Sequence, residues 1–128
     1  MTENELSKII VDAAYRIHVD LGPGLLESVY ESVLAAELQK RELKIERQKP
    51  IQFHYAGITF EEGFRIDLLV NDLVIVELKS TEQTHPVHKK QLKTYLRLAG
   101  KRLGLLINFG TELFKDGVSR VVLGLPND

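Results

Sequence analysis

Apolar positions in the first forty residues recur with the period of an α-helix. In residues 4–20 they fall at i, i+3 and i+4, and the same spacing returns in residues 25–41. Such spacing predicts an amphipathic helix with one apolar face. Between the two runs stands Gly22-Pro23-Gly24, a combination that ends one element and begins the next. The sequence therefore predicts two N-terminal helices.

Further along, the pattern changes to that of β-strands. Apolar and polar residues alternate in 51–55, and Ala56-Gly57 supplies a turn. Residues 58–70 continue as a strand up to a second turn at Asn71-Asp72. The next segment, 73–79, has the sequence LVIVELK, whose β-branched residues are typical of a buried strand. We expect three strands here, the last two joined as a hairpin.

One more helix and two more strands complete the pattern. Helical spacing returns in residues 86–99, where Pro86 suits the first turn and Gly100 the end. Apolar runs at 103–109 and 118–123 predict the last two strands. The order ααβββαββ indicates an α/β fold in which helices flank a mixed sheet.

The composition is that of one globular domain. The chain has 128 residues, of which 44% are apolar and 27% charged. It contains no cysteine, which excludes disulfides, thiolate zinc sites, iron–sulfur clusters and cysteine nucleophiles. Its start carries acids where a signal peptide would carry lysines, and no apolar run approaches the ~20 residues that span a bilayer. We expect a single domain over residues 1–128, in a cytoplasmic protein with no membrane attachment.

Charge is unevenly distributed although the net charge is only −1. Residues 1–42 carry eight acids and four bases, whereas residues 83–111 carry six bases and no acid. These bases are Lys89, Lys90, Lys93, Arg97, Lys101 and Arg102. Such a segment can attract a polyanion even on a neutral protein. A solvated helix face is the other interpretation.

Charged residues also interrupt the apolar strands of the predicted hairpin. Glu77 and Lys79 project from one face of their strand, roughly 7 Å apart, because side chains alternate. Asp67 lies ten residues before Glu77, and the turn between them can bring the two acids to one side. Buried charges are costly unless they are paired or bind a metal. A plain buried ion pair, or a strand end that reaches solvent, is the alternative interpretation.

A shared divalent cation would explain the two acids. Oxygen ligands suit Mg²⁺, which takes one or two carboxylates and keeps several waters. Beside such an ion, Lys79 could orient or deprotonate a water molecule, or balance the charge of a phosphate. This combination of groups points to hydrolysis.

The second predicted helix offers a third acid. With helical spacing, Gly24, Glu27 and Glu31 share one face. Glu27 could point from this face into the pocket of Asp67 and Glu77. In the alternative interpretation, Glu27 is an exposed first-turn glutamate that complements the helix dipole.

The third predicted helix carries Gln91 and Tyr95 on one side, with His88 one turn before Gln91. Gln91 could hydrogen-bond a metal-bound water or a phosphate, and Tyr95 could support it or touch substrate. An ordinary polar helix face with a half-buried tyrosine is the alternative. His85 and His88 could also bind zinc, although a histidine pair without further ligands is usually polar surface.

Together these residues resemble the PD-(D/E)xK nuclease superfamily. The residues that carry the resemblance are Asp67 and Glu77-x-Lys79, a preceding helix with Glu27, and a following helix with Gln91-x-x-x-Tyr95. Within the superfamily, the chain is similar to the GxxExxY proteins over residues 5–123. The similar segments are LGPGLLESVYESVL, RIDLLV, VIVELKS, QLKTYLRL and LGLLINFG.

The resemblance implies a fold and a set of roles. The fold is a mixed central sheet flanked by helices, with the αβββαβ core of restriction endonucleases. The implied metal ligands are Glu27, Asp67 and Glu77, and the implied ion is Mg²⁺ or Mn²⁺. Lys79 would assist the attacking water, and Gln91 and Tyr95 would support the site and contact DNA. The residue before Asp67 is Ile66 where the superfamily motif has proline, a departure that is frequent among its members.

We therefore expect a metal-dependent nuclease that hydrolyses phosphodiester bonds of DNA. Candidate DNA contacts are Tyr95, His88, Lys89, Lys90, Lys93 and Arg97. A homodimer would help so short a chain hold both strands. Two other classes fit the residues: a non-catalytic nucleic-acid-binding or regulatory module on the same fold, and a structural protein whose buried charges are merely paired.

Overall fold

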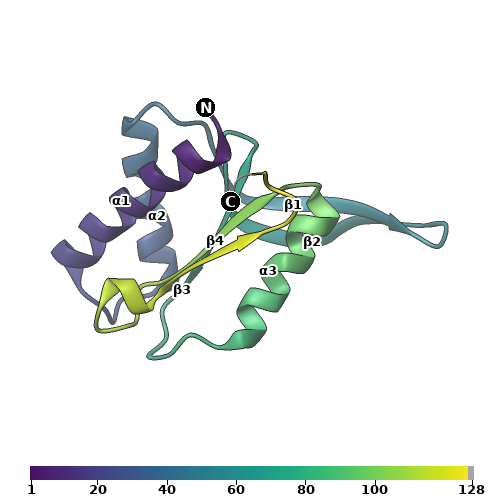
Figure 1. Cartoon of the computed structure of the whole chain (residues 1–128). Coiled ribbons are helices and arrows are strands. Elements are labelled where there is room, and N and C mark those ends of the chain that lie inside the picture. Colours follow the sequence, from purple (N-terminus) through teal and green to yellow (C-terminus); the bar gives the residue numbers. More distant parts are fainter. Residues whose placement is uncertain (127–128) are drawn as a thin grey trace.

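Five strands form one mixed sheet in the computed structural model, which describes residues 1–126 (Figure 1). The strands lie in the sheet in chain order; β3 and β4 are parallel, and the other neighbours are antiparallel. The elements are α1 (Glu3–Leu21), α2 (Glu27–Lys40), β1 (Ile45–Tyr55), β2 (Ile58–Val70), β3 (Val74–Lys79), α3 (Pro86–Ala99), β4 (Leu103–Asn108), the 3₁₀ helix η1 (Phe114–Asp116) and β5 (Val118–Val122). This order confirms the predicted ααβββαββ pattern and contains the expected αβββαβ core.

Helices cover both faces of the sheet, as predicted (Figure 1). On one face, α1 and α2 pack over alternate residues of β3 such as Val74 and Val76. On the other, α3 inserts Leu92 and Leu96 against Ile75 and Leu106. The parallel pair β3 and β4 is thus buried on both sides, which explains its continuous apolar sequence. Across the part of the chain that the structure describes, no helix has the length and apolar character to cross a membrane.

The helix ends follow local sequence signals, with one correction. A capping box of Thr2 and Glu5 begins α1, and Gly100 ends α3 in the left-handed conformation that glycine favours. The second helix begins at Glu27, two residues later than predicted, and Gly24 lies in the preceding loop with φ 110°. Gly24 therefore shares no helix face with Glu27.

The first strand is longer than predicted, since β1 begins at Ile45 and not at residue 51. Its first half has no apolar alternation because its residues 46–50 are polar or proline and are only partly covered. Pro50 is compatible with the place of β1 at the edge of the sheet, because a proline in a sheet needs an edge without a hydrogen-bonding neighbour.

The outer half of the β1–β2 hairpin projects beyond the helices (Figure 1). Aromatic rings tie it back to the body: Phe53 stacks on Phe60 with centroids 4.9 Å apart, and Phe64 stacks on Tyr95 of α3 at 4.2 Å. Gly63 makes room for this packing, since a Cβ there would lie 2.2 Å from the ring of Phe53. The hairpin thereby positions one edge of the site described next.

Candidate active site

The sheet divides between β2 and β3 at Asp67. The two strands pair only from Leu68 opposite Val76 to the turn, while β2 continues outward with β1 alone. The side chains of β2 also change face here, because Ile66 packs with the α3 cluster and Leu68 with the α1–α2 cluster. We call this division, with the side chains of Asp67, Glu77 and Lys79 around it, the fork.

Asp67 and Glu77 lie side by side at the fork, where the predicted hairpin would bring them. The backbone N–H of Asp67 donates to Oε2 of Glu77 over 2.7 Å. In return, the backbone N–H of Leu78 donates to Oδ2 of Asp67 over 2.8 Å. Carboxylate oxygens thus accept hydrogen bonds at the point where the ladder between β2 and β3 ends. Local backbone geometry fixes the two acids together.

The electrostatic environment of these acids disfavours their charge. Glu77 is only 7% exposed, and burial together with the charge of Asp67 raises its pKa to about 8. Burial also raises the pKa of Asp67, against the hydrogen bonds from Leu78 and Gln48. Two adjacent carboxyl groups, one buried and one half-buried, that resist joint ionisation fit a divalent cation, which would favour the charged form of both.

Lys79 shares the β3 face of Glu77 and is half-buried. Its positive charge lowers the pKa of both acids, against the larger effect of burial. Among the described residues, however, Lys79 forms no ion pair within 4.0 Å of either acid. The described side chains thus give no support to the alternative of a plain buried ion pair. The lysine and the acids remain separate groups around one space.

A polar network from α2 and β1 contacts the fork, and the sequence alone did not indicate most of its residues. Glu31 is 7% exposed and forms an ion pair with Arg47 at 2.9 Å. Gln48 donates to Oε1 of Glu31 over 2.6 Å and to Oδ1 of Asp67 over 3.2 Å. Only Glu31 carried a sequence signal, its shared helix face with Glu27. Gln48 and Arg47 lie in the half of β1 that showed no strand pattern.

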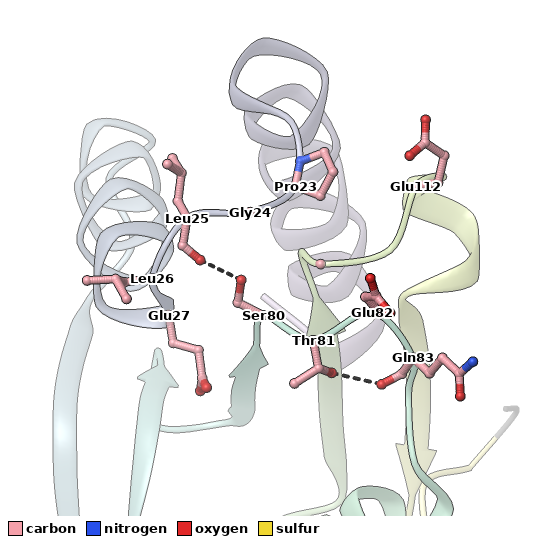
Figure 2. A pocket seen from close by; sticks show the side chains of 11 residues that line it. Pro23, Gly24, Leu25, Leu26, Glu27, Ser80, Thr81, Glu82, Gln83 and Glu112 are labelled. Atoms are coloured by element: carbon pink, nitrogen blue, oxygen red, sulfur yellow. Dashed lines mark hydrogen bonds between the residues drawn. The ribbon is translucent and has the colours of Figure 1, made fainter.

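Glu27 lies at the start of α2, exposed, between two cavities. The smaller, of about 380 Å³, is also lined by Glu31, Gln48 and Asp67. The larger, of about 770 Å³, is formed by loops beyond the end of β3 (Figure 2). Glu27 thus borders the space around Asp67. Burial has the largest effect on the pKa of Asp67 and Glu77. Of the two acids of α2, it is Glu31 and not Glu27 whose charge raises both pKa values further.

Tyr30 fixes the loop before α2 and thereby the start of the helix at Glu27. Its buried ring stacks on Phe109 with centroids 4.4 Å apart. Its hydroxyl donates to the carbonyl of Gly22 over 2.5 Å and accepts from the N–H of Leu25 over 3.2 Å. Ser80 adds a 2.5 Å hydrogen bond to the carbonyl of Leu25, drawn in Figure 2. The loop is therefore tied to the end of β3.

Helix α3 presents His88 and Tyr95 toward the fork and most of its bases elsewhere. Burial and then the charges of Glu77 and Asp67 raise the pKa of Tyr95. Burial, Lys79 and His85 lower the pKa of His88, whose Nδ1 is buried without a hydrogen-bond partner among the described residues. Gln91 is exposed on the same side.

The basic residues of α3 form a separate ridge, which comprises Lys89, Lys90, Lys93 and Arg97. All four are exposed, and none has an ion-pair partner among residues 1–126. Helical spacing puts them about 120–160° around the axis from Tyr95. Lys101 and Arg102 differ, because they pair with Asp72 and Glu3. The basic ridge is therefore available to an external anion.

The described side chains do not form a group of three metal ligands. Within residues 1–126, no group of three or more His, Cys, Asp or Glu side chains is arranged to hold a metal ion. His85 and His88, whose ring centroids are 5.7 Å apart, accordingly gain no third ligand for zinc. Asp67 and Glu77 form a pair, which suffices for an ion that keeps several waters.

Comparison with known families agrees with this geometry. The family model of the PD-(D/E)XK nuclease superfamily matches residues 4–121. The chain therefore belongs to this superfamily, whose nuclease members generally use divalent metal ions and act on nucleic acids. Searches of curated proteins and of solved structures give no significant match.

Proposed function

We propose that this protein is a Mg²⁺- or Mn²⁺-dependent nuclease that hydrolyses phosphodiester bonds of DNA, and that it is of the GxxExxY kind within its superfamily. The observation that carries the proposal is the pairing of Asp67 with Glu77 at the fork. Lys79 lies beside the two acids but forms an ion pair with neither among the described residues. A structural charge cluster would be expected to form direct ion pairs instead.

Each residue has a defined part in this proposal. Asp67 and Glu77 would hold the cation, and Glu27 would complete its ligands by turning toward them from the start of α2. A bound divalent cation supplies charge to stabilise the phosphate and lowers the pKa of water. Lys79 orients the attacking water or stabilises charge on the phosphate. Gln91 and Tyr95 order the hydrogen bonds around the scissile group.

DNA contacts would extend from the fork along α3. His88 would contact the phosphates near the scissile one, since the charges of Lys79 and Glu27 both act on its pKa. The basic ridge would contact DNA phosphates farther from the cleavage point. Such contacts position DNA without sequence specificity. A homodimer and a cytoplasmic location stay predictions from the sequence.

A non-catalytic nucleic-acid-binding module is the second candidate. The observation in its favour is that Glu27 does not join Asp67 and Glu77 in a group of three ligands among the described residues. This module would bind DNA equally well after the loss of Asp67 or Glu77, because the basic ridge would carry the affinity.

Cleavage of labelled single-stranded, duplex and branched DNA with Mg²⁺ or Mn²⁺ tests the proposal. We expect cleavage that requires the metal and disappears in Asp67→Ala and Lys79→Ala, with folding checked by circular dichroism. Absence of cleavage on every substrate, or equal cleavage by the variants, would contradict the proposal. DNA binding that survives in both variants would then favour the second candidate.

A further inference from the structure

We propose that Gln48 is a positioning residue of the fork: its side-chain amide connects Glu31 on α2 to Asp67 on β2 and so holds Asp67 in the orientation that binds a divalent cation. This inference rests on the proposed cation site and extends it to a residue outside the Asp-Glu-Lys set. It depends on three features of Gln48: its hydrogen bonds, its backbone conformation and its neutral charge.

The hydrogen bonds of Gln48 join two carboxylates from different elements. Its Nε2 carries two hydrogens, and it donates to Glu31 over 2.6 Å and to Asp67 over 3.2 Å. The other oxygen of Asp67 accepts from the N–H of Leu78 over 2.8 Å. Each oxygen of Asp67 thus has its own donor, one from β1 and one from β3, which fixes the rotation of the carboxylate.

The backbone of Gln48 adopts an unusual conformation that makes this contact possible. Its φ is 47°, in the left-handed region that residues other than glycine rarely occupy. In a regular strand, consecutive side chains point to opposite faces, yet Arg47 and Gln48 both reach the carboxylate of Glu31. The flanking pairs Arg47–Leu68 and Lys49–Ile66 keep their register, so the irregularity is confined to Gln48 opposite Asp67.

The chemical type of the side chain suits a site that must stay negative. Arg47 already pairs with Glu31, so the amide adds a donor without adding a second positive charge. A lysine at this position would place an ammonium group between the two carboxylates and compete with a metal cation. A neutral amide orients Asp67 and leaves its charge for the cation.

The test compares two glutamines of the same strand in the full-length protein. Gln48→Met keeps the length of the side chain and removes its donors. Gln52→Met is the matched control, because Gln52 also donates from β1 to a carboxylate, that of Glu61 over 2.8 Å, away from the fork. Titration with Mn²⁺ by calorimetry should show about 10- to 100-fold weaker binding for Gln48→Met, and no change for Gln52→Met.

Two further measurements separate positioning from structural support. Gln48→Gly relieves the left-handed backbone but lacks the amide, so it should lose Mn²⁺ affinity as Gln48→Met does, whatever its thermal stability. Without any metal, hydrogen exchange at the N–H of Leu78 should quicken in Gln48→Met and not in Gln52→Met, because Asp67 loses its second donor.

Equal Mn²⁺ affinity and equal Leu78 exchange in the two methionine variants would overturn the role of Gln48. Failure of the nuclease proposal has a different signature: the wild-type protein would bind Mn²⁺, with the Gln48 effect present, and cleave no DNA. A wild-type protein that binds no Mn²⁺ would overturn both.

Discussion

Glu3 and Glu77 are each only 7% exposed, but Glu77 lies deeper in the protein, and their surroundings shift their pKa values in opposite directions. Glu3 begins α1, where a hydrogen bond from its own backbone N–H and then its contact with Arg102, 3.0 Å away, lower its pKa. At the fork, burial and Asp67 raise the pKa of Glu77 to about 8. A small exposed fraction alone therefore does not mark a functional acid; the stronger desolvation of Glu77 and its neighbouring carboxylate distinguish it from Glu3.

The comparison separates two uses of a buried glutamate. The Glu3–Arg102 pair connects the start of α1 to the strand end at β4 and has no neighbouring carboxylate among its causes of pKa change. The fork instead holds two acids together through backbone hydrogen bonds, and none of the described cations lies in contact with either acid. The first arrangement joins two elements of the fold, whereas the second is the one that we propose binds a cation. The predictions below test this distinction.

The largest effect should come from exchanging each acid for its amide. Glu77→Gln should reduce metal-dependent cleavage by about 10³-fold or more. It removes a ligand of the proposed cation and should thereby raise the activation barrier by several kcal/mol. Glu3→Gln should leave cleavage within about twofold and lower stability by up to about 1 kcal/mol. Cleavage rates and urea denaturation of the two variants provide the measurement. Equal loss of cleavage in both would remove the distinction.

Replacement of the lysine should separate chemistry from cation binding. Lys79→Met should slow cleavage by about 10²- to 10⁴-fold, the range for a group that assists proton transfer or stabilises charge. Its Mn²⁺ affinity, measured by calorimetry, should not fall, because the lysine contacts neither acid. Lys8→Met, at an exposed position of α1, is the control for loss of one charge. Loss of Mn²⁺ binding in Lys79→Met would instead assign the lysine to the structure of the site.

Stability of the metal-free protein should depend on pH through the fork. Folded Glu77 keeps its proton up to about pH 8, whereas the unfolded carboxyl loses it near its ordinary value of 4.5. The folded state therefore binds more protons between these values, and the free energy of unfolding should fall as pH rises through this window, on the order of a few kcal/mol. Denaturation at several pH values should show a flatter profile for Glu77→Gln. An identical profile would contradict the raised pKa.

Glu3 should change the free energy of unfolding with the opposite dependence on pH. Its pKa is lowered on folding, so its stabilising effect is present above its ordinary value of 4.5 and is lost as the pH falls through the folded value. Glu3→Gln should therefore alter the acid side of the same profile and leave the slope up to pH 8 intact.

The smallest effect should come from the basic ridge of α3. Lys90→Ala with Arg97→Ala should weaken DNA binding several-fold and reduce the salt dependence of log Kd by about 2, because each lost phosphate contact contributes about 0.9. Lys8→Ala with Lys40→Ala, on α1 and α2, removes the same charge elsewhere. Fluorescence anisotropy at several salt concentrations gives both slopes. Matching slopes for the two double variants would assign the effect to net charge alone.

Much of the fold follows from sequence because its signals are local. The capping residues, the buried strand Val74–Lys79 and the turn before it specify the hairpin, and the hairpin brings Asp67 to Glu77. The first half of β1 carries no such signal, since this strand packs only Ile45 and Ile51 against the core clusters and has polar residues at most positions between them. Its position comes from pairing with β2, a tertiary effect.

The polar network escaped prediction for the same reason. Gln48 acts through a left-handed backbone in mid-strand and a contact with Glu31 seventeen residues away, and neither has a pattern in the sequence. Glu31 shared a helix face with Glu27, but one face can serve an ion pair or a metal site equally well. Only the three-dimensional position of Arg47 and Gln48 shows that Glu31 supports the fork.

Proton release on cation binding tests most directly whether the fork is a divalent-cation site. Calorimetric titration with Mn²⁺ at pH 7, in two buffers of different ionisation enthalpy, counts the protons released. A pKa of about 8 for Glu77 predicts release of close to one proton per bound ion, and much less from Glu77→Gln at reduced affinity. Binding without proton release, or equal binding by Glu77→Gln, would contradict the assignment of the cation to Asp67 and Glu77.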